Sequence, residues 1–150
     1  MRAVLLLYCL GFLACSPSSW SEKKSFSNGI WAYGDSLVLS PQIEDTSVLH
    51  NTWLEITVDE TYPYRNLYIH EAIRTPSDSV FNHIQEFELM KEDGTWLQKP
   101  GLLSGGKVTF RLPILSGFKF KETGNWQVSC KEYMRTDSLE GVHQVKWTLE

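Results

Sequence analysis

The sequence predicts an all-β protein, an antiparallel β-sandwich for which a jelly roll is one fitting topology. From Trp31 to the C terminus, apolar and polar residues alternate with period two, and no segment keeps a helical pattern over three turns. Turn-forming residues separate the alternating segments, as at residues 75–78, 92–94, 104–106 and 123–125. Short strands punctuated in this way, without intervening helices, are typical of β-sandwiches.

The alternation defines the predicted strands in order. They are residues 36–43, 53–58, 67–73, 83–90, 108–114, 126–134 and 145–149. In the sixth, Trp126, Val128, Cys130 and Met134 share one side. We therefore expect Cys130 to be buried and to behave as a small hydrophobic residue.

One acidic residue breaks the pattern of the third strand. Glu71 has the parity of the apolar residues Leu67, Ile69 and Ile73. It should therefore lie at an end of the sheet or form an ion pair, with Arg65 or Arg135 as the candidate partner.

Length and composition indicate a single globular domain and exclude some classes of partner. A chain of 150 residues has room for one ordinary domain. Its 42% hydrophobic and 13% aromatic residues can form a packed core. Because 18 acidic residues outnumber 14 basic ones, the sequence has no cationic excess of the kind that binds phosphate backbones. Nucleic acid is therefore not an expected partner.

The N-terminus predicts export and lipid attachment. Residues 3–14 follow a single basic residue, Arg2, and are apolar without charge. Twelve residues are too few for a membrane span of roughly 20, but match the ~7 to 15 of a signal peptide. Ala14 and Cys15 end this stretch in the manner of a bacterial lipobox. We interpret residues 1–14 as a lipoprotein signal peptide and Cys15 as the acylated residue; ordinary secretion with a nearby cleavage site and a first core helix are the alternatives.

The cysteines and the following segment fit this interpretation. Cys9 would leave with the signal peptide and Cys15 would carry lipid, which leaves Cys130 without a partner for an internal disulfide. Residues 16–28 contain six serines and show no apolar periodicity. We predict that residues 15–28 form the acylated cysteine and a flexible tether spanning on the order of 20 Å. The folded domain is predicted for residues 29–150.

The residues that usually carry chemistry show no catalytic or metal-binding pattern. The four histidines have no metal-ligand spacing, and Ser104 lacks the Gly-x-Ser-x-Gly context of a hydrolase nucleophile. Glu55, Glu86 and Glu88 fall on polar strand faces, as solvated carboxylates do. Trp96, which follows a turn, either stacks on sugars or packs its hairpin. The sequence therefore predicts no cofactor, no metal and no enzymatic activity.

Two segments carry a family resemblance. Residues 61–69 read TYPYRNLYI and open a predicted strand, and residues 134–142 read MRTDSLEGV before the final strand. In this order, with EFEL and DGTW between them, they resemble the YPYxNL and MRxDxLxGV patterns of the gliding-motility lipoprotein GldH family over about residues 28–150. The resemblance implies a membrane-anchored, non-enzymatic accessory of a gliding apparatus linked to type IX secretion.

The same motifs supply the candidate contact residues. The resemblance suggests Tyr62, Tyr64, Arg65, Arg135 and Asp137 as residues that bind envelope proteins. Alternatively, Arg135 and Asp137 form an ion pair that braces their loop. The rival function is a carbohydrate-binding envelope lipoprotein, because exposed tryptophan and tyrosine rings can stack on sugars.

The residues after Cys15 bear on localisation. In lipoproteins of gliding bacteria, acidic residues directly after the acylated cysteine favour export to the cell surface, whereas here the first acid is Glu22. We therefore expect the domain at the periplasmic face of the outer membrane.

Overall fold

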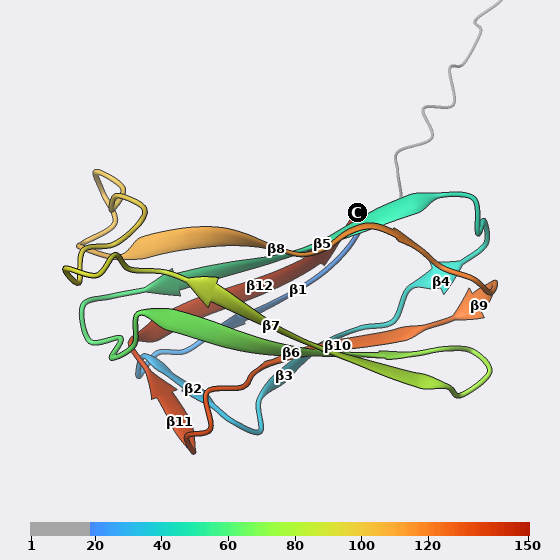
Figure 1. Cartoon of the computed structure of the whole chain (residues 1–150), viewed down its shortest axis with the longest axis horizontal. Coiled ribbons are helices and arrows are strands. Elements are labelled where there is room, and N and C mark those ends of the chain that lie inside the picture. Colours follow the sequence, from blue (N-terminus) through green and yellow to red (C-terminus); the bar gives the residue numbers. More distant parts are fainter. Residues whose placement is uncertain (1–18) are drawn as a thin grey trace, which may run out of the picture.

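The computed structural model describes residues 19–150, which form strands, turns and loops (Figure 1). The first six strands are β1 (Trp20–Ser25), β2 (Ile30–Ala32), β3 (Ser36–Leu39), β4 (Gln42–Ile43), β5 (Leu49–Val58) and β6 (Asn66–Arg74). The remaining strands are β7 (Val80–Glu88), β8 (Val108–Lys119), β9 (Gly124–Asn125), β10 (Gln127–Glu132), β11 (Ser138–Glu140) and β12 (Val142–Leu149). Within this part of the chain, no helix is long and apolar enough to cross a membrane.

Two four-stranded antiparallel sheets form a sandwich, which confirms the predicted fold class. Sheet I has the order β1-β12-β5-β8 and is the upper layer in Figure 1; sheet II has the order β3-β10-β6-β7 and is the lower layer. The pairs β1–β12, β3–β10, β5–β8 and β6–β7 nest inside one another along the chain. This is the order produced when a long hairpin is rolled into two sheets, so the topology is a jelly roll.

The core lies between the sheets and follows directly from the period-two pattern. Alternate side chains of β5, β6, β10 and β12 are buried. Large residues fill the space, among them Trp31, Trp147 and Phe120, each at most 1% exposed. Cys130 is fully buried on β10, as the alternation predicts, and is the one free cysteine of the described residues.

The predicted tether is wrong for residues 20–25, which form β1 and pair with β12 along their whole length. Their polar composition does not predict a strand, but an edge strand needs only backbone hydrogen bonds on one side and tolerates charged side chains. Glu22 also accepts a hydrogen bond from the backbone N–H of Val38 in β3, which links the edges of the two sheets. Cys15 and the signal peptide lie outside the described residues.

Several strand boundaries differ from the prediction. The predicted strand 36–43 is divided into β3 and β4, with Pro41, which has no N–H to donate, in the break. In contrast, β8 continues through Pro113 to Lys119, because β8 is an edge strand and can accommodate a proline. The predicted strand 83–90 is instead β7, Val80–Glu88, which shares a hairpin with β6.

Glu71 is neither at a sheet end nor in an ion pair, so both expectations for it are wrong. It lies in the middle of β6 with 0% exposure, and neither Arg65 nor Arg135 contacts its carboxyl group. Its Oε1 accepts a long hydrogen bond from Thr52 Oγ1 at 3.4 Å, and its Oε2 has no hydrogen-bond partner among the described residues. Burial raises the pKa of this carboxyl group to about 7 despite the hydrogen bond from Thr52, so the core favours its neutral form.

Candidate functional site

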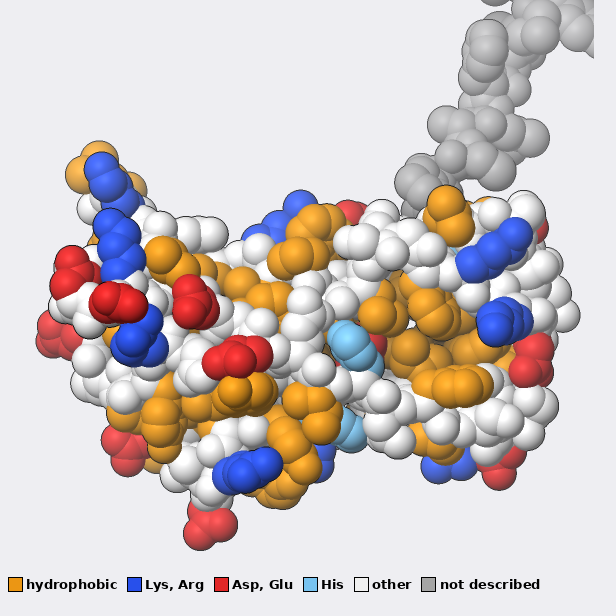
Figure 2. Space-filling model, in the orientation of Figure 1, with side chains coloured by type: hydrophobic (Ala, Val, Ile, Leu, Met, Phe, Trp, Pro, Cys, Tyr) orange, Lys and Arg blue, Asp and Glu red, His pale blue; other side chains and the backbone are white. Residues whose placement is uncertain are grey.

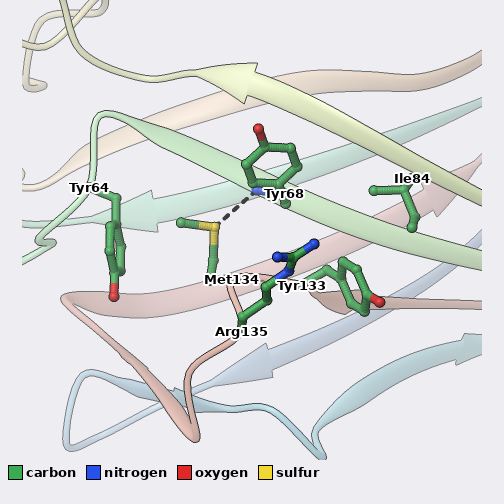
Figure 3. Close-up of a pocket in the computed structure, with 6 residues that line it drawn as sticks. All are labelled: Tyr64, Tyr68, Ile84, Tyr133, Met134 and Arg135. Carbon is green, nitrogen blue, oxygen red and sulfur yellow. Dashed lines mark hydrogen bonds between the residues drawn. The ribbon is translucent and has the colours of Figure 1, made fainter.

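The outer face of sheet II carries a tyrosine-lined hollow of about 450 Å³. Because β6 buries Leu67 and Ile69, the intervening Tyr68 points outward. Side chains from the loop before β6, from β6 and β7, and from the loop after β10 meet around it. These residues, which we call the tyrosine surface, are Tyr64, Tyr68, Ile84, Tyr133, Met134 and Arg135 (Figure 3).

The loop after β10 contacts β6 through two interactions, and a buried carboxylate at the end of β10 binds the backbone of the loop. The N–H of Tyr133 donates to the carbonyl of Tyr68 at 2.8 Å, and the N–H of Tyr68 contacts Met134 Sδ at 3.1 Å (Figure 3). Glu132 is fully buried and accepts a 2.8 Å hydrogen bond from the N–H of Met134. These contacts place Met134 and the following arginine over the hollow.

Arg135 has a strained backbone. Its φ of 59° lies in the left-handed region, which residues other than glycine seldom adopt. The guanidinium group forms no salt bridge within residues 19–150, and Asp137 next to it is exposed without one. The ion pair predicted to brace this loop is therefore not formed. Backbone strain of this kind concentrates at functional sites.

The surroundings of Tyr68 favour the neutral form of its phenol group. A hydrogen bond to the carboxylate of Glu86 is the main reason that the pKa of Tyr68 is raised. The pKa of Glu86 is lowered, first by the amide of Asn66, whose Nδ2 lies 2.5 Å from Oε1, and then by Tyr68. Tyr68 therefore stays protonated at neutral pH while Glu86 stays ionised.

The two tyrosines of the YPY motif have different positions. Tyr64 lines the hollow, whereas Tyr62 is buried and its hydroxyl donates to the carbonyl of Asn66 at 2.6 Å. The rings of Tyr62 and Tyr64 meet edge to face at 6.1 Å, and Trp96 approaches Tyr62 at 6.2 Å. Tyr62 thus supports Tyr64 from beneath, which corrects its prediction as a contact residue. Trp96 packs its hairpin, the second of its two predicted roles.

Arg65 and Asp137 are exposed but do not line the hollow. The carbonyl of Arg65 accepts hydrogen bonds from the N–H groups of Leu89 and Met90, which joins the start of β6 to the end of the hairpin. Of the five predicted contact residues, the structure therefore brings together Tyr64 and Arg135 alone at the hollow.

Sequence reasoning missed Tyr68, Ile84, Tyr133 and Met134. A signal for two of them was present, since Tyr68 and Ile84 are large residues with the outward parity of their strands. The apolar surface continues beyond the hollow: the ring of Tyr133 lies 5.6 Å from His70 and 6.5 Å from Tyr33. Tyrosine, methionine and arginine are the residue types enriched at protein interfaces.

Metal chemistry has no support in the described part of the chain. Residues 19–150 contain no group of three or more histidine, cysteine, aspartate or glutamate side chains placed to hold an ion. The arrangement on sheet II offers a concave shape, aromatic surface, one cation and phenol hydroxyl groups. These are features suited to binding a partner.

Comparison with known proteins agrees with the motifs on this surface. The chain is 26% identical over 113 residues to the gliding motility lipoprotein GldH homolog of Christiangramia forsetii, covering 71% of this chain and 68% of that protein. It is 22% identical over 157 aligned residues to the gliding motility lipoprotein GldH of Flavobacterium johnsoniae, covering 98% and 94% of the two chains. The sequence model of the GldH lipoprotein family matches residues 19–146, from β1 into β12, and the chain therefore belongs to the GldH lipoprotein family.

Proposed function

We propose that this protein is a non-enzymatic accessory of a gliding-motility or type IX secretion apparatus. Lipid on Cys15 holds it in the cell envelope, and the tyrosine surface of sheet II binds an envelope protein. The family name supports the association with gliding motility, and the binding surface is inferred from the geometry of the hollow.

The observation that carries this proposal is Arg135. A non-glycine residue at φ 59° costs stability, of order 1–3 kcal/mol, and its guanidinium gains no ion pair in return. A partner that supplies a carboxylate or backbone carbonyls would satisfy it. The neighbouring Tyr68 and Tyr133 would supply the apolar area around such a contact, as aromatic residues do at hot spots.

The carbohydrate-binding alternative has a specific weakness. Sugar stacking uses exposed aromatic faces, and no tryptophan is among the large exposed hydrophobic residues of the described chain. Trp53 is half-buried and covered by the guanidinium of Arg111, 4.2 Å from its ring centre. The aromatic residues that are exposed, Phe81 at 61% and Tyr33 at 38%, do not line the hollow.

In-cell photocrosslinking at Tyr68 tests the proposal. A photoreactive phenylalanine at this position should give a discrete protein adduct, and Arg135→Asn should greatly reduce its yield, because asparagine tolerates the left-handed backbone but has no cationic group. Arg74→Ala is the matched control, since Arg74 is an exposed arginine at the far end of β6. Adducts that contain only glycan, or that are equally sensitive to both variants, would contradict a protein contact here.

We also propose that the domain faces the periplasm from the outer membrane. The support is the absence of acidic residues among positions 16–21. Protease added to intact cells should leave the protein whole, and digestion should begin once the outer membrane is opened. Cleavage in intact cells would instead place the domain on the cell surface.

A further inference from the structure

The described residues include two pairs of exposed apolar side chains at opposite ends of sheet I. Leu102 and Leu103, in the loop before β8, are 100% and 96% exposed. Val48 and Leu49, where β5 begins, are 45% and 61% exposed. Leu49 pairs with Lys119, the last residue of β8, whereas the leucine loop leads into Val108, its first residue. The two pairs are therefore separated by about the length of β8.

These apolar points belong to the same side of the sandwich. In Figure 1 the loop between β7 and β8 rises above the upper layer, which is sheet I, and Figure 2 shows its hydrophobic tip beside basic side chains. Lys99 and Lys107 flank the two leucines in the sequence. Leu49 has the outward parity of β5, so it lies on the outer face of sheet I. Apolar tips flanked by lysines are a pattern that suits the lipid–water interface.

The outer face between these points has mixed, interfacial chemistry. Trp53 lies on it beneath Arg111, and Lys146 projects from β12. Two carboxylates share this face, Glu55 and Glu150, and Arg111 contacts both. Tryptophan with arginine and lysine is the side-chain set that favours the headgroup region of a bilayer.

Chain length places this sheet close to lipid. If Cys15 is acylated, as in the proposed function on which this inference rests, only residues 16–19 separate it from β1 at the edge of sheet I. The five Cα–Cα steps from Cys15 to Trp20 can span at most about 18 Å when the chain is fully extended. The anchor therefore cannot hold β1 far from the membrane.

We propose that the outer face of sheet I lies on the lipid bilayer, with Leu49 at one end and the Leu102–Leu103 loop at the other inserted among the headgroups. Sheet II is then turned away from the lipid. This orientation leaves the tyrosine surface open to the aqueous compartment, where a protein partner can reach it.

Lipid quenching of site-specific fluorophores tests this orientation. The full-length acylated protein would be reconstituted in vesicles of phosphatidylethanolamine and phosphatidylglycerol that contain brominated acyl chains. An environment-sensitive dye is attached through Leu49→Cys, Leu102→Cys or, as the matched control, Ile84→Cys. Ile84 is an apolar residue 50% exposed on β7 of sheet II, and the native Cys130 is buried and should not react.

We expect strong quenching at positions 49 and 102 and little at position 84. Quenching at position 49 alone would mean that only one end of sheet I contacts the membrane. Equal quenching at position 84 would mean that the domain has no preferred orientation on the membrane. Either result overturns the proposal. Unquenched dyes on protein that still sediments with the vesicles would also overturn it. Failure of the unlabelled protein to sediment would instead refute the lipid anchor, so the two failures are distinguishable.

A charge at the loop tip gives a second measurement on the same vesicles. Without its acyl chains, the Cys15→Ala protein should keep only a weak, reversible partition into vesicles at high lipid concentration. Leu102→Glu should reduce this partition by roughly tenfold or more, the scale expected for one leucine withdrawn from lipid. Ile84→Glu should leave that partition unchanged. A loss of partition with Ile84→Glu, or none with Leu102→Glu, would assign membrane contact to another face.

Discussion

Gly141 lies directly against the backbone of Tyr62. A Cβ atom at position 141 would stand 2.3 Å from the nitrogen of Tyr62 and 2.6 Å from its Cα. Gly141 also has a φ of 74°, and its carbonyl accepts a 3.0 Å hydrogen bond from the N–H of Asp59. The two family motifs, far apart in sequence, therefore meet through a contact that only glycine allows.

Gly141→Ala should lower the free energy of unfolding by at least about 2 kcal/mol, because it adds a backbone clash to the usual penalty of a left-handed residue. Urea denaturation measures the change. Gly94→Ala is the matched control: its φ is 80°, but no atom lies within 4 Å of the added Cβ. Gly94→Ala should therefore lower the free energy of unfolding only by the penalty of a left-handed backbone, about 1 kcal/mol. Equal losses in the two variants would show that the contact with Tyr62 is not tight.

Glu71 should make stability depend on pH. Below about pH 4.5 the carboxyl group is protonated in both the folded and the unfolded chain. As the pH rises from there to about 7, the unfolded chain loses this proton first, so the free energy of unfolding falls, by about 3 kcal/mol in total, and then levels off. Glu71→Gln should remove this component.

The test compares urea denaturation of the wild type and Glu71→Gln at several pH values. The difference between the two isolates Glu71 from Glu132, a second buried carboxyl group whose pKa is raised by burial. Glu60→Gln, at an exposed position, is the control and should leave the pH profile unchanged. A variant that remains as sensitive to pH as the wild type would refute the buried neutral acid.

Cys130 should resist thiol reagents in the native protein. Burial, and secondarily the neighbouring Glu71, raise the pKa of its thiol. The reagent therefore cannot reach the sulfur, and the reactive thiolate form is scarce. Labelling should become rapid only in denaturant. A cysteine introduced at Leu102, which is fully exposed, should react at once and serves as the positive control. Rapid native labelling of Cys130 would mean that β10 opens readily.

Cys15→Ala should abolish lipid labelling and release the domain to the soluble envelope fraction. Several acyl chains anchor a protein almost irreversibly, and the substitution removes the site of attachment. The fold should persist, because β1 begins five residues later, at Trp20. Fatty-acid labelling and membrane fractionation provide the measurement. If the variant stays entirely with the membrane, the anchor is elsewhere.

Local residue patterns suffice to predict the main strands of the core and the family of the protein. Period-two alternation is a local property, and it correctly predicts β6 and β12 and the burial of Cys130. The family motifs are also local features of the sequence, and the family match confirms the family that they indicate. Both the strand pattern and the motifs are defined by neighbouring residues in the sequence, so they can be recognised without knowing any long-range contact.

The position of β1, the burial of Glu71 and the composition of the tyrosine surface depend on contacts between distant parts of the chain. The polar β1 is a strand because β12 offers it an unpaired backbone edge. Glu71 is buried because two sheets close over it. The hollow combines four segments, the loop before β6, β6, β7 and the loop after β10, which meet only when the sheets form. Backbone pairing and sheet closure act between residues distant in sequence, and local patterns do not encode which surfaces they bring together.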